Sequence, residues 1–209
     1  MNQPLARKAC AVLLSAFILL GAYYGSFLPM RKSQIFISAM RDLRSVTSVA
    51  EFKNVFARPL GVPSPIGQEE LVRNGANTVL NVLQQTDKPE VIAELMDFVE
   101  SSYRPIIERG RGMSFEQNLY IMGTLNELAF IKTQDNKYFA AAKSYYSEGL
   151  KLGPKRPQFL YGLFDIYRIE GNVEATKEIA AQILSQWPED QRTKDALDEF
   201  MQKILTVKK

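Results

Sequence analysis

Residues 141–172 read AAKSYYSEGLKLGPKRPQFLYGLFDIYRIEGN, and their pattern of small, aromatic and proline residues is the most informative of the sequence about its fold. It contains Pro154, and Pro188 follows it 34 residues further on. If each proline follows the end of a helix pair, apolar and small side chains recur at matching helical positions in two successive copies. In the first copy, the second-helix positions are Ala142, Tyr146 and Gly149. In the next copy, the first-helix and turn positions are Leu160, Leu163, Tyr167 and Gly171, and the second-helix positions are Ala180 and Ile183.

The two copies resemble degenerate tetratricopeptide repeats, in which two antiparallel helices form one unit. Three departures from the repeat pattern are clear. Phe164 stands where glycine or alanine is usual, Thr176 replaces a small alanine, and the first helix of the first copy fits poorly around residues 133–137. The resemblance implies an all-α fold in which residues 111–209 form an α-solenoid of antiparallel helix pairs, tetratricopeptide-like, with a capping helix.

Residues 33–110 are predicted to form an N-terminal helical segment, because apolar residues return at three and four positions and no alternating strand pattern competes. Ser64 and Pro65 fit an N-cap and a first-turn proline, which places Glu69 and Glu70 near the positive end of a helix dipole rather than in a catalytic pair. The expected helices cover 33–46, 48–56, 69–85 and 88–103, with breaks at 58–67, 86–90 and 108–114.

Residues 1–32 are predicted to be a membrane anchor. Positions 9–30, ACAVLLSAFILLGAYYGSFLPM, carry no charge and are bracketed by Arg7-Lys8 and Arg31-Lys32. At ~1.5 Å per residue a helix of this length covers the ~30 Å hydrocarbon core of a bilayer. The alternative is a cleaved secretory signal, which shares the basic start and the apolar stretch but is usually shorter.

Composition excludes several function classes. The chain has no histidine, which removes His-based catalysis and imidazole metal sites, and its one cysteine, Cys10, cannot form an internal disulfide or a thiolate zinc site. The net charge of +3 comes from the flanks of the apolar run, and the rest of the chain carries 22 basic and 23 acidic residues. We therefore expect no enzyme activity, no cofactor, no metal and no nucleic acid partner.

Stacked helix pairs leave a concave groove lined by first-helix residues, which suits a protein partner. In the clearer repeat the groove-facing positions are Gln158, Tyr161, Asp165 and Arg168. For Asp165 and Arg168 an ordinary solvated helix face is the alternative. The other aromatic residues of this region are expected to pack between helices: Tyr145, Tyr146, Phe159, Phe164 and Tyr167. A basic cluster further upstream fits either lipid headgroups and polyanionic sugar or a solvated turn: Arg104, Arg109 and Arg111.

The order of an apolar span, a helical segment and these repeats resembles the last span and tail of bacterial O-antigen ligase/polymerase-like membrane proteins. The most distinctive stretches are SPIGQEELVR and GPKRPQFLYGLFDIYRIEGN. The resemblance implies association with surface-polysaccharide transfer from a lipid carrier by a bundle of many spans. This chain has one span and no histidine, so no catalytic residue is carried over.

Two functions follow. The first is a membrane-anchored helical-repeat scaffold or adaptor that docks a partner protein, with the envelope glycan machinery as the partner system that the resemblance implies. The second is a split or truncated accessory tail of a glycan-transfer enzyme. For the single-pass orientation, two basic residues before the span and four after it favour a cytoplasmic domain, whereas the family resemblance favours an extracytoplasmic one, which we expect.

Overall fold

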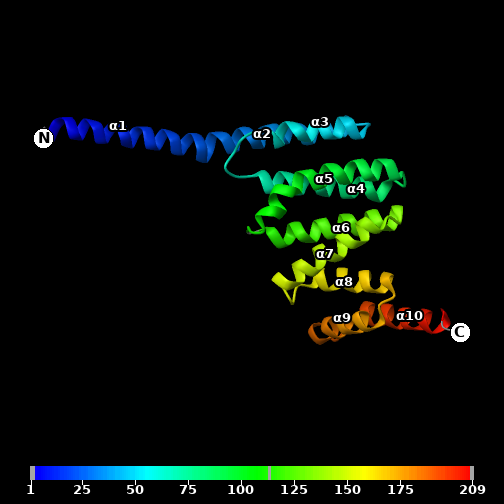
Figure 1. The fold of residues 1–209 in the computed structure, drawn as a ribbon. Coiled ribbons are helices and arrows are strands. Elements are labelled where there is room, and N and C mark those ends of the chain that lie inside the picture. Colours follow the sequence, from blue (N-terminus) through cyan, green and yellow to red (C-terminus); the bar gives the residue numbers. More distant parts are fainter. Residues whose placement is uncertain (1–2, 113, 208–209) are drawn as a thin grey trace. The chain divides into compact units, whose positions relative to one another are not determined.

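The computed structural model describes residues 3–112 and 114–207, and every regular element within them is helical (Figure 1). The predicted all-α class is therefore confirmed for the described part of the chain. The elements in order are α1 (Gln3–Ala22), the π-helical turn η1 (Tyr23–Phe27), α2 (Leu28–Asp42), the 3-10 turn η2 (Leu43–Ser45), α3 (Val49–Leu60), α4 (Gln68–Gln85), α5 (Pro89–Arg109), α6 (Phe115–Thr133), α7 (Asn136–Leu152), α8 (Pro157–Glu170), α9 (Val173–Gln186) and α10 (Gln191–Val207).

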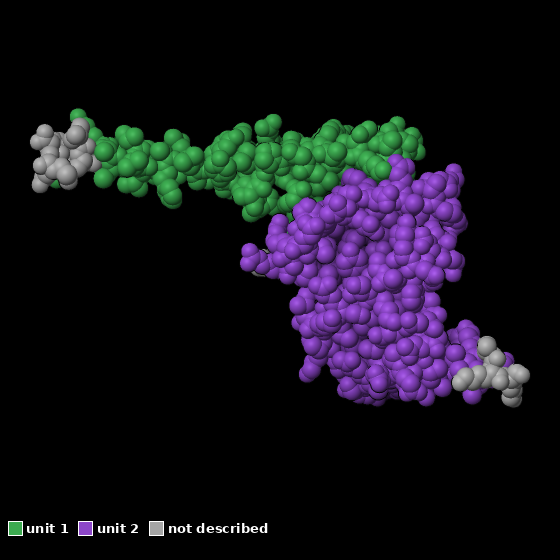
Figure 2. Space-filling model, viewed as in Figure 1, with its two compact units in different colours: residues 1–75 green, residues 76–209 purple. Residues whose placement is uncertain are grey.

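The chain divides into two compact units, residues 1–75 and residues 76–209, which Figure 2 colours separately. This division differs from the boundaries that the sequence suggests after residues 32 and 110. Position 32 lies inside α2, which continues to Asp42 and packs against α3. Gly110 ends α5 in the left-handed conformation, with a φ of 62°, but α5 still packs against α6. The domain boundaries predicted after residues 32 and 110 stay predictions.

An apolar helix begins the chain. Residues 7–45 form one helical segment whose most apolar stretch has a mean hydropathy of 1.9, and only 6% of that stretch is buried. Side chains such as Leu13, Phe17 and Leu19 are exposed. By length and composition this segment can cross a membrane, a criterion that an N-terminal signal sequence also meets.

The first unit is held together where α2 meets α3. Ala39 of α2 and Phe56 of α3 are fully buried, and the rings of Phe52 and Phe56 lie 4.9 Å apart between centroids. The first turn of α3 is capped from its own sequence, since the Ser48 hydroxyl accepts a hydrogen bond from the Glu51 amide at 3.2 Å. The Glu51 carboxylate accepts in return from the Thr47 amide at 2.8 Å.

The start of α4 corrects one prediction. The N-cap assigned to Ser64 is wrong, because α4 begins only at Gln68 and the Ser64 hydroxyl instead donates to the Ile66 carbonyl at 2.9 Å. Gly67 has a φ of 89°, a left-handed conformation that keeps the residues before it out of the helix. Glu69 and Glu70 do lie in the first turn of α4, as the dipole argument predicts.

In the second unit α5 to α10 pack in chain order, each helix against the next. The connections alternate in length: two residues join α6 to α7 and α8 to α9, whereas four residues join α7 to α8 and α9 to α10. Pro154 and Pro188 both lie in the longer connections, just after α7 and α9. The helical positions predicted to be core are buried at Ala142, Tyr146, Gly149, Leu160, Leu163, Ala180 and Ile183, and Tyr167 is half-buried.

The Tyr146 ring organises the centre of this unit. It is 2% exposed and lies between two glycines, Gly123 of α6 and Gly162 of α8. A Cβ atom on Gly123 would lie 2.4 Å from the ring, and one on Gly162 would lie 2.7 Å from it. Gly149 makes the same kind of room for the buried Phe159 ring. Glycine therefore sets how closely α6, α7 and α8 approach one another.

We predict that Gly149→Ala lowers the free energy of unfolding by about 1–3 kcal/mol, because the added Cβ would lie 2.1 Å from the Phe159 ring. Gly21→Ala in α1 is the control, since a Cβ there has no neighbour within 4 Å. Thermal and denaturant unfolding of the two variants measure the difference. Equal midpoints for both variants would contradict the close packing of α7 on α8.

Candidate functional site

The four residues predicted to line a partner groove all lie on α8, and all four are half-buried. Tyr161, Asp165 and Arg168 line one small cavity of about 70 Å³, together with Phe164. Gln158 is not part of its lining. The opposite wall comes from the first turns of α10, through Arg192, Thr193 and Ala196. The structure thus brings three of the four predicted residues together and places α10 beside them; their role in partner binding stays a prediction.

Tyr161 has a second role that the sequence did not show. Its hydroxyl donates a hydrogen bond to the Asp190 carboxylate at 2.6 Å, and its ring stacks on Trp187 with 6.1 Å between centroids. Asp190 also caps α10 by accepting from the amide and the hydroxyl of Thr193, at 3.2 Å and 2.6 Å. These bonds lower the pKa of Asp190. Tyr161 therefore packs against the residues that precede α10 and hydrogen-bonds to its capping residue, Asp190.

Asp165 and Arg168 form an ion pair one helical turn apart on α8, with 3.0 Å between Oδ1 and Nη1. The guanidinium also lies over the Phe164 ring, 5.3 Å from its centroid. Its buried Nε has no hydrogen-bond partner within the described residues. The pair is only half-buried, so its charges stay accessible to a ligand.

Glu127 of α6 belongs to the same region, and sequence reasoning missed it. Its carboxylate accepts a hydrogen bond from the Tyr146 hydroxyl at 2.7 Å. Burial raises the pKa of Glu127, and the charge of Asp165 raises it further, while the Tyr146 hydrogen bond opposes the rise. Glu127 and Asp165 form an acidic surface in which Arg168 already pairs with Asp165, so Glu127 is the carboxylate near which an added positive charge would be stabilised.

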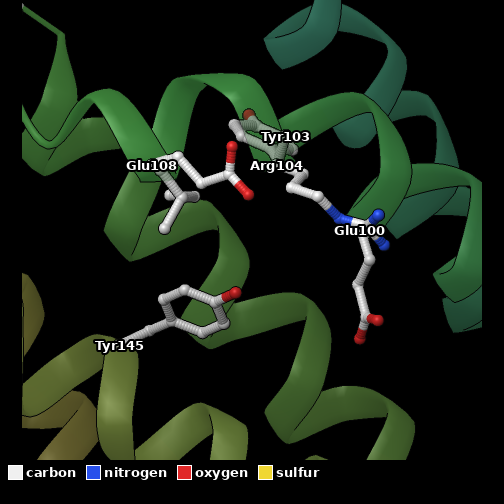
Figure 3. Close-up of a pocket in the computed structure, with 6 residues that line it drawn as sticks. Glu100, Tyr103, Arg104, Glu108 and Tyr145 are labelled. Atoms are coloured by element: carbon white, nitrogen blue, oxygen red, sulfur yellow. The ribbon is translucent and has the colours of Figure 1, made fainter.

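A second cleft, of about 260 Å³, lies between α5 and α7 (Figure 3). Glu100, Arg104 and Glu108 project into it from α5, opposite Tyr145 of α7. Burial, with the neighbouring Asp97, raises the pKa of Glu100. Because two carboxylates flank Arg104, the predicted basic cluster is not a uniformly positive surface at this position.

No protein-family model, curated protein or solved structure matches this chain. The resemblance to O-antigen ligase/polymerase-like proteins and to tetratricopeptide repeats therefore stays a prediction from the sequence. Among the described residues no group of three or more histidine, cysteine or carboxylate side chains comes close enough together to hold a metal ion.

We predict that Glu127→Gln raises the thermal midpoint at pH 7 by about 2–4 °C, a typical shift for a modest gain in a domain of this size. A carboxyl whose pKa is raised on folding stabilises the fold when protonated and loses that contribution as the pH rises above its ordinary value. The gain should therefore shrink as the pH falls toward about 4.

Glu178→Gln, at an exposed position on α9, is the control and should show no such pH-dependent difference from the wild type. Thermal melts of the full chain in neutral detergent between pH 4 and pH 7 make the comparison. A lower midpoint for Glu127→Gln at pH 7, or a difference that does not change with pH, would contradict the burial of a charged carboxylate.

Proposed function

We propose that this chain is a single-pass membrane protein whose helical-repeat part is a scaffold that docks a partner protein. In this proposal α6 with α7, and α8 with α9, are antiparallel pairs of a short tetratricopeptide-like solenoid, and α10 is its capping helix. Three observations support the pairing: the alternating connection lengths, the prolines after α7 and α9, and the contact of α6 with α8, the first helices of successive pairs.

The acidic surface at Glu127 and Asp165 is the observation that carries the docking proposal. The Glu127 carboxylate is largely removed from water, and the partner that the structure gives it is a neutral hydroxyl. Burying a carboxylate costs free energy that a nearby cation offsets. A partner segment that places a lysine or arginine side chain against Glu127 and Asp165 would supply that cation. The scaffold is therefore expected to select a basic segment of its partner.

The proposal assigns no chemistry to the chain itself. The sequence lacks histidine and shows no nucleophile or phosphate-binding motif, which leaves binding as the role best supported by the residues. The association with surface-polysaccharide assembly rests on the sequence resemblance alone. The apolar helix supports membrane attachment by its length and composition.

Photo-crosslinking in cells tests the docking surface. We predict that a benzophenone amino acid at Gln158, on the predicted partner face, forms a defined adduct, whereas the same probe at the exposed Lys177 of α9 does not. Asp165→Lys should reduce the adduct at Gln158 about tenfold or more, because it reverses a charge at the surface that receives the cation. Asp198→Lys, at an exposed position on α10, is the matched charge-reversal control and should leave the adduct unchanged.

Adducts of equal yield from Gln158 and Lys177 would contradict the proposal, as would an adduct that survives Asp165→Lys. Circular dichroism of Asp165→Lys confirms that the helical fold persists. The half-exposed position of Asp165 makes unfolding by this substitution unexpected.

A further inference from the structure

A pocket in the first unit lies at the level where the apolar helix gives way to polar sequence. It has a volume of about 390 Å³ and is formed by α2, the residues that lead into α4 and the first turns of α4. Phe36 and Ile37 of α2, with Ile66 before α4, provide its apolar lining. Ile37 and Ile66 are 48% and 62% exposed, so this lining is open to solvent. An apolar lining open to solvent beside a pocket offers a surface that the apolar part of a ligand can contact.

Lys32 lines the same pocket and is the most unusual charge in the described chain. The residue is only 3% exposed. Its ammonium donates to the Val62 carbonyl at 2.9 Å and to the Gln68 side-chain oxygen, and both acceptors are neutral. A buried ammonium is normally stabilised by an anion, because neutral acceptors do not compensate its charge. An ammonium has three donors, so one donor is left for a further acceptor.

The other charged residue of the pocket does not supply that anion. Glu70 also lines the pocket, but its carboxylate is 71% exposed and lies 3.8 Å from the guanidinium of Arg73. Arg31, the neighbour of Lys32 on α2, is exposed. The position therefore combines an enclosed positive charge with an adjacent open apolar wall.

The position of Lys32 in the chain bears on the class of ligand that this pocket suits. Lys32 follows the uncharged run 9–30 by two residues, so in a chain anchored by that run it lies at the depth of the lipid phosphates. A phospholipid presents an anionic phosphate beside a glycerol backbone and acyl methylenes. These two parts match the ammonium of Lys32 and the wall of Phe36, Ile37 and Ile66.

We propose that this pocket binds the headgroup of an anionic phospholipid, with the phosphate against Lys32 and the first acyl methylenes against the apolar wall. The proposal rests on the proposed membrane anchorage and is independent of the docking surface in the second unit. It gives Lys32 a role beyond flanking the span, since a flanking lysine extends toward the headgroups and stays solvated.

Native mass spectrometry of the full chain in neutral detergent tests the proposal. The probes are dioctanoyl phosphatidylglycerol, dioctanoyl phosphatidylcholine and inorganic phosphate. The wild type is expected to bind one phosphatidylglycerol about tenfold more tightly than phosphatidylcholine: both lipids carry the phosphodiester, but the choline ammonium offsets its charge and is repelled by the Lys32 ammonium. Inorganic phosphate, which lacks the acyl part, should not displace the lipid at equal concentration.

Lys32→Met keeps the apolar stem and should remove the tenfold preference. Arg31→Gln removes the same charge one residue away and should change binding less than twofold. Ile66→Asp, at a position outside the core, should also abolish the preference because its carboxylate repels the phosphate. Ile66→Asp therefore keeps the proposal testable if Lys32→Met fails to fold.

Equal affinities of the wild type for the two lipids would overturn the proposal. So would an equal loss in Arg31→Gln and Lys32→Met, or displacement of the lipid by inorganic phosphate. Alkaline carbonate extraction of membranes tests the anchorage separately: release of the chain would overturn the anchorage, whereas the lipid titration in detergent judges the pocket alone.

Discussion

The packing of the Tyr146 ring between two glycines is the constraint on which the second unit depends. A ring can fill the space between α6 and α8 only if neither helix has a Cβ atom where it faces the ring, and Gly123 and Gly162 meet this condition. The same residue extends its hydroxyl beyond the core to the Glu127 carboxylate at 2.7 Å and to the Thr124 hydroxyl at 3.2 Å. Burial and the charge of Glu127 raise the pKa of Tyr146, so the phenol stays a hydrogen-bond donor at neutral pH. One side chain therefore sets the helix spacing and holds the acidic group that we propose for docking.

The repeat register determines which of these packing residues can be predicted from the sequence. The register set by Pro154 places Tyr146 and Gly149 in the core without any structural information, because a 34-residue period combines with helical spacing. The partner glycine on α6 was not predicted, because the repeat pattern fits poorly before residue 137. Glu127 was missed for a related reason. The buried residues of α6 lie all around the helix, so no single polar face marks an exposed or functional position.

Other differences between the sequence predictions and the structure come from backbone geometry and from chain segments outside the repeats. The N-cap assigned to Ser64 overlooked Gly67, whose left-handed conformation delays the start of α4. Tyr161 was assigned to an open groove because the repeat pattern does not include the loop at Trp187 and Asp190 that packs against it. In the first unit Lys32 was interpreted as a basic flank of the span. Its ammonium donates to the carbonyl of Val62, thirty positions later, and no local sequence pattern predicts such a contact.

If Tyr146 couples α6, α7 and α8 into one cooperative unit, amide hydrogen exchange should detect the coupling. Tyr146→Ala removes a ring whose burial is worth about 3–5 kcal/mol. Mass-spectrometric hydrogen exchange of the full chain in neutral detergent should then show protection falling together in α6, α7 and α8. Tyr138→Ala, also on α7 and also buried, is the control. It should leave the protection of α8 unchanged, because the Tyr146 ring still packs between Gly123 and Gly162. A loss of protection confined to α7 in Tyr146→Ala would contradict the account.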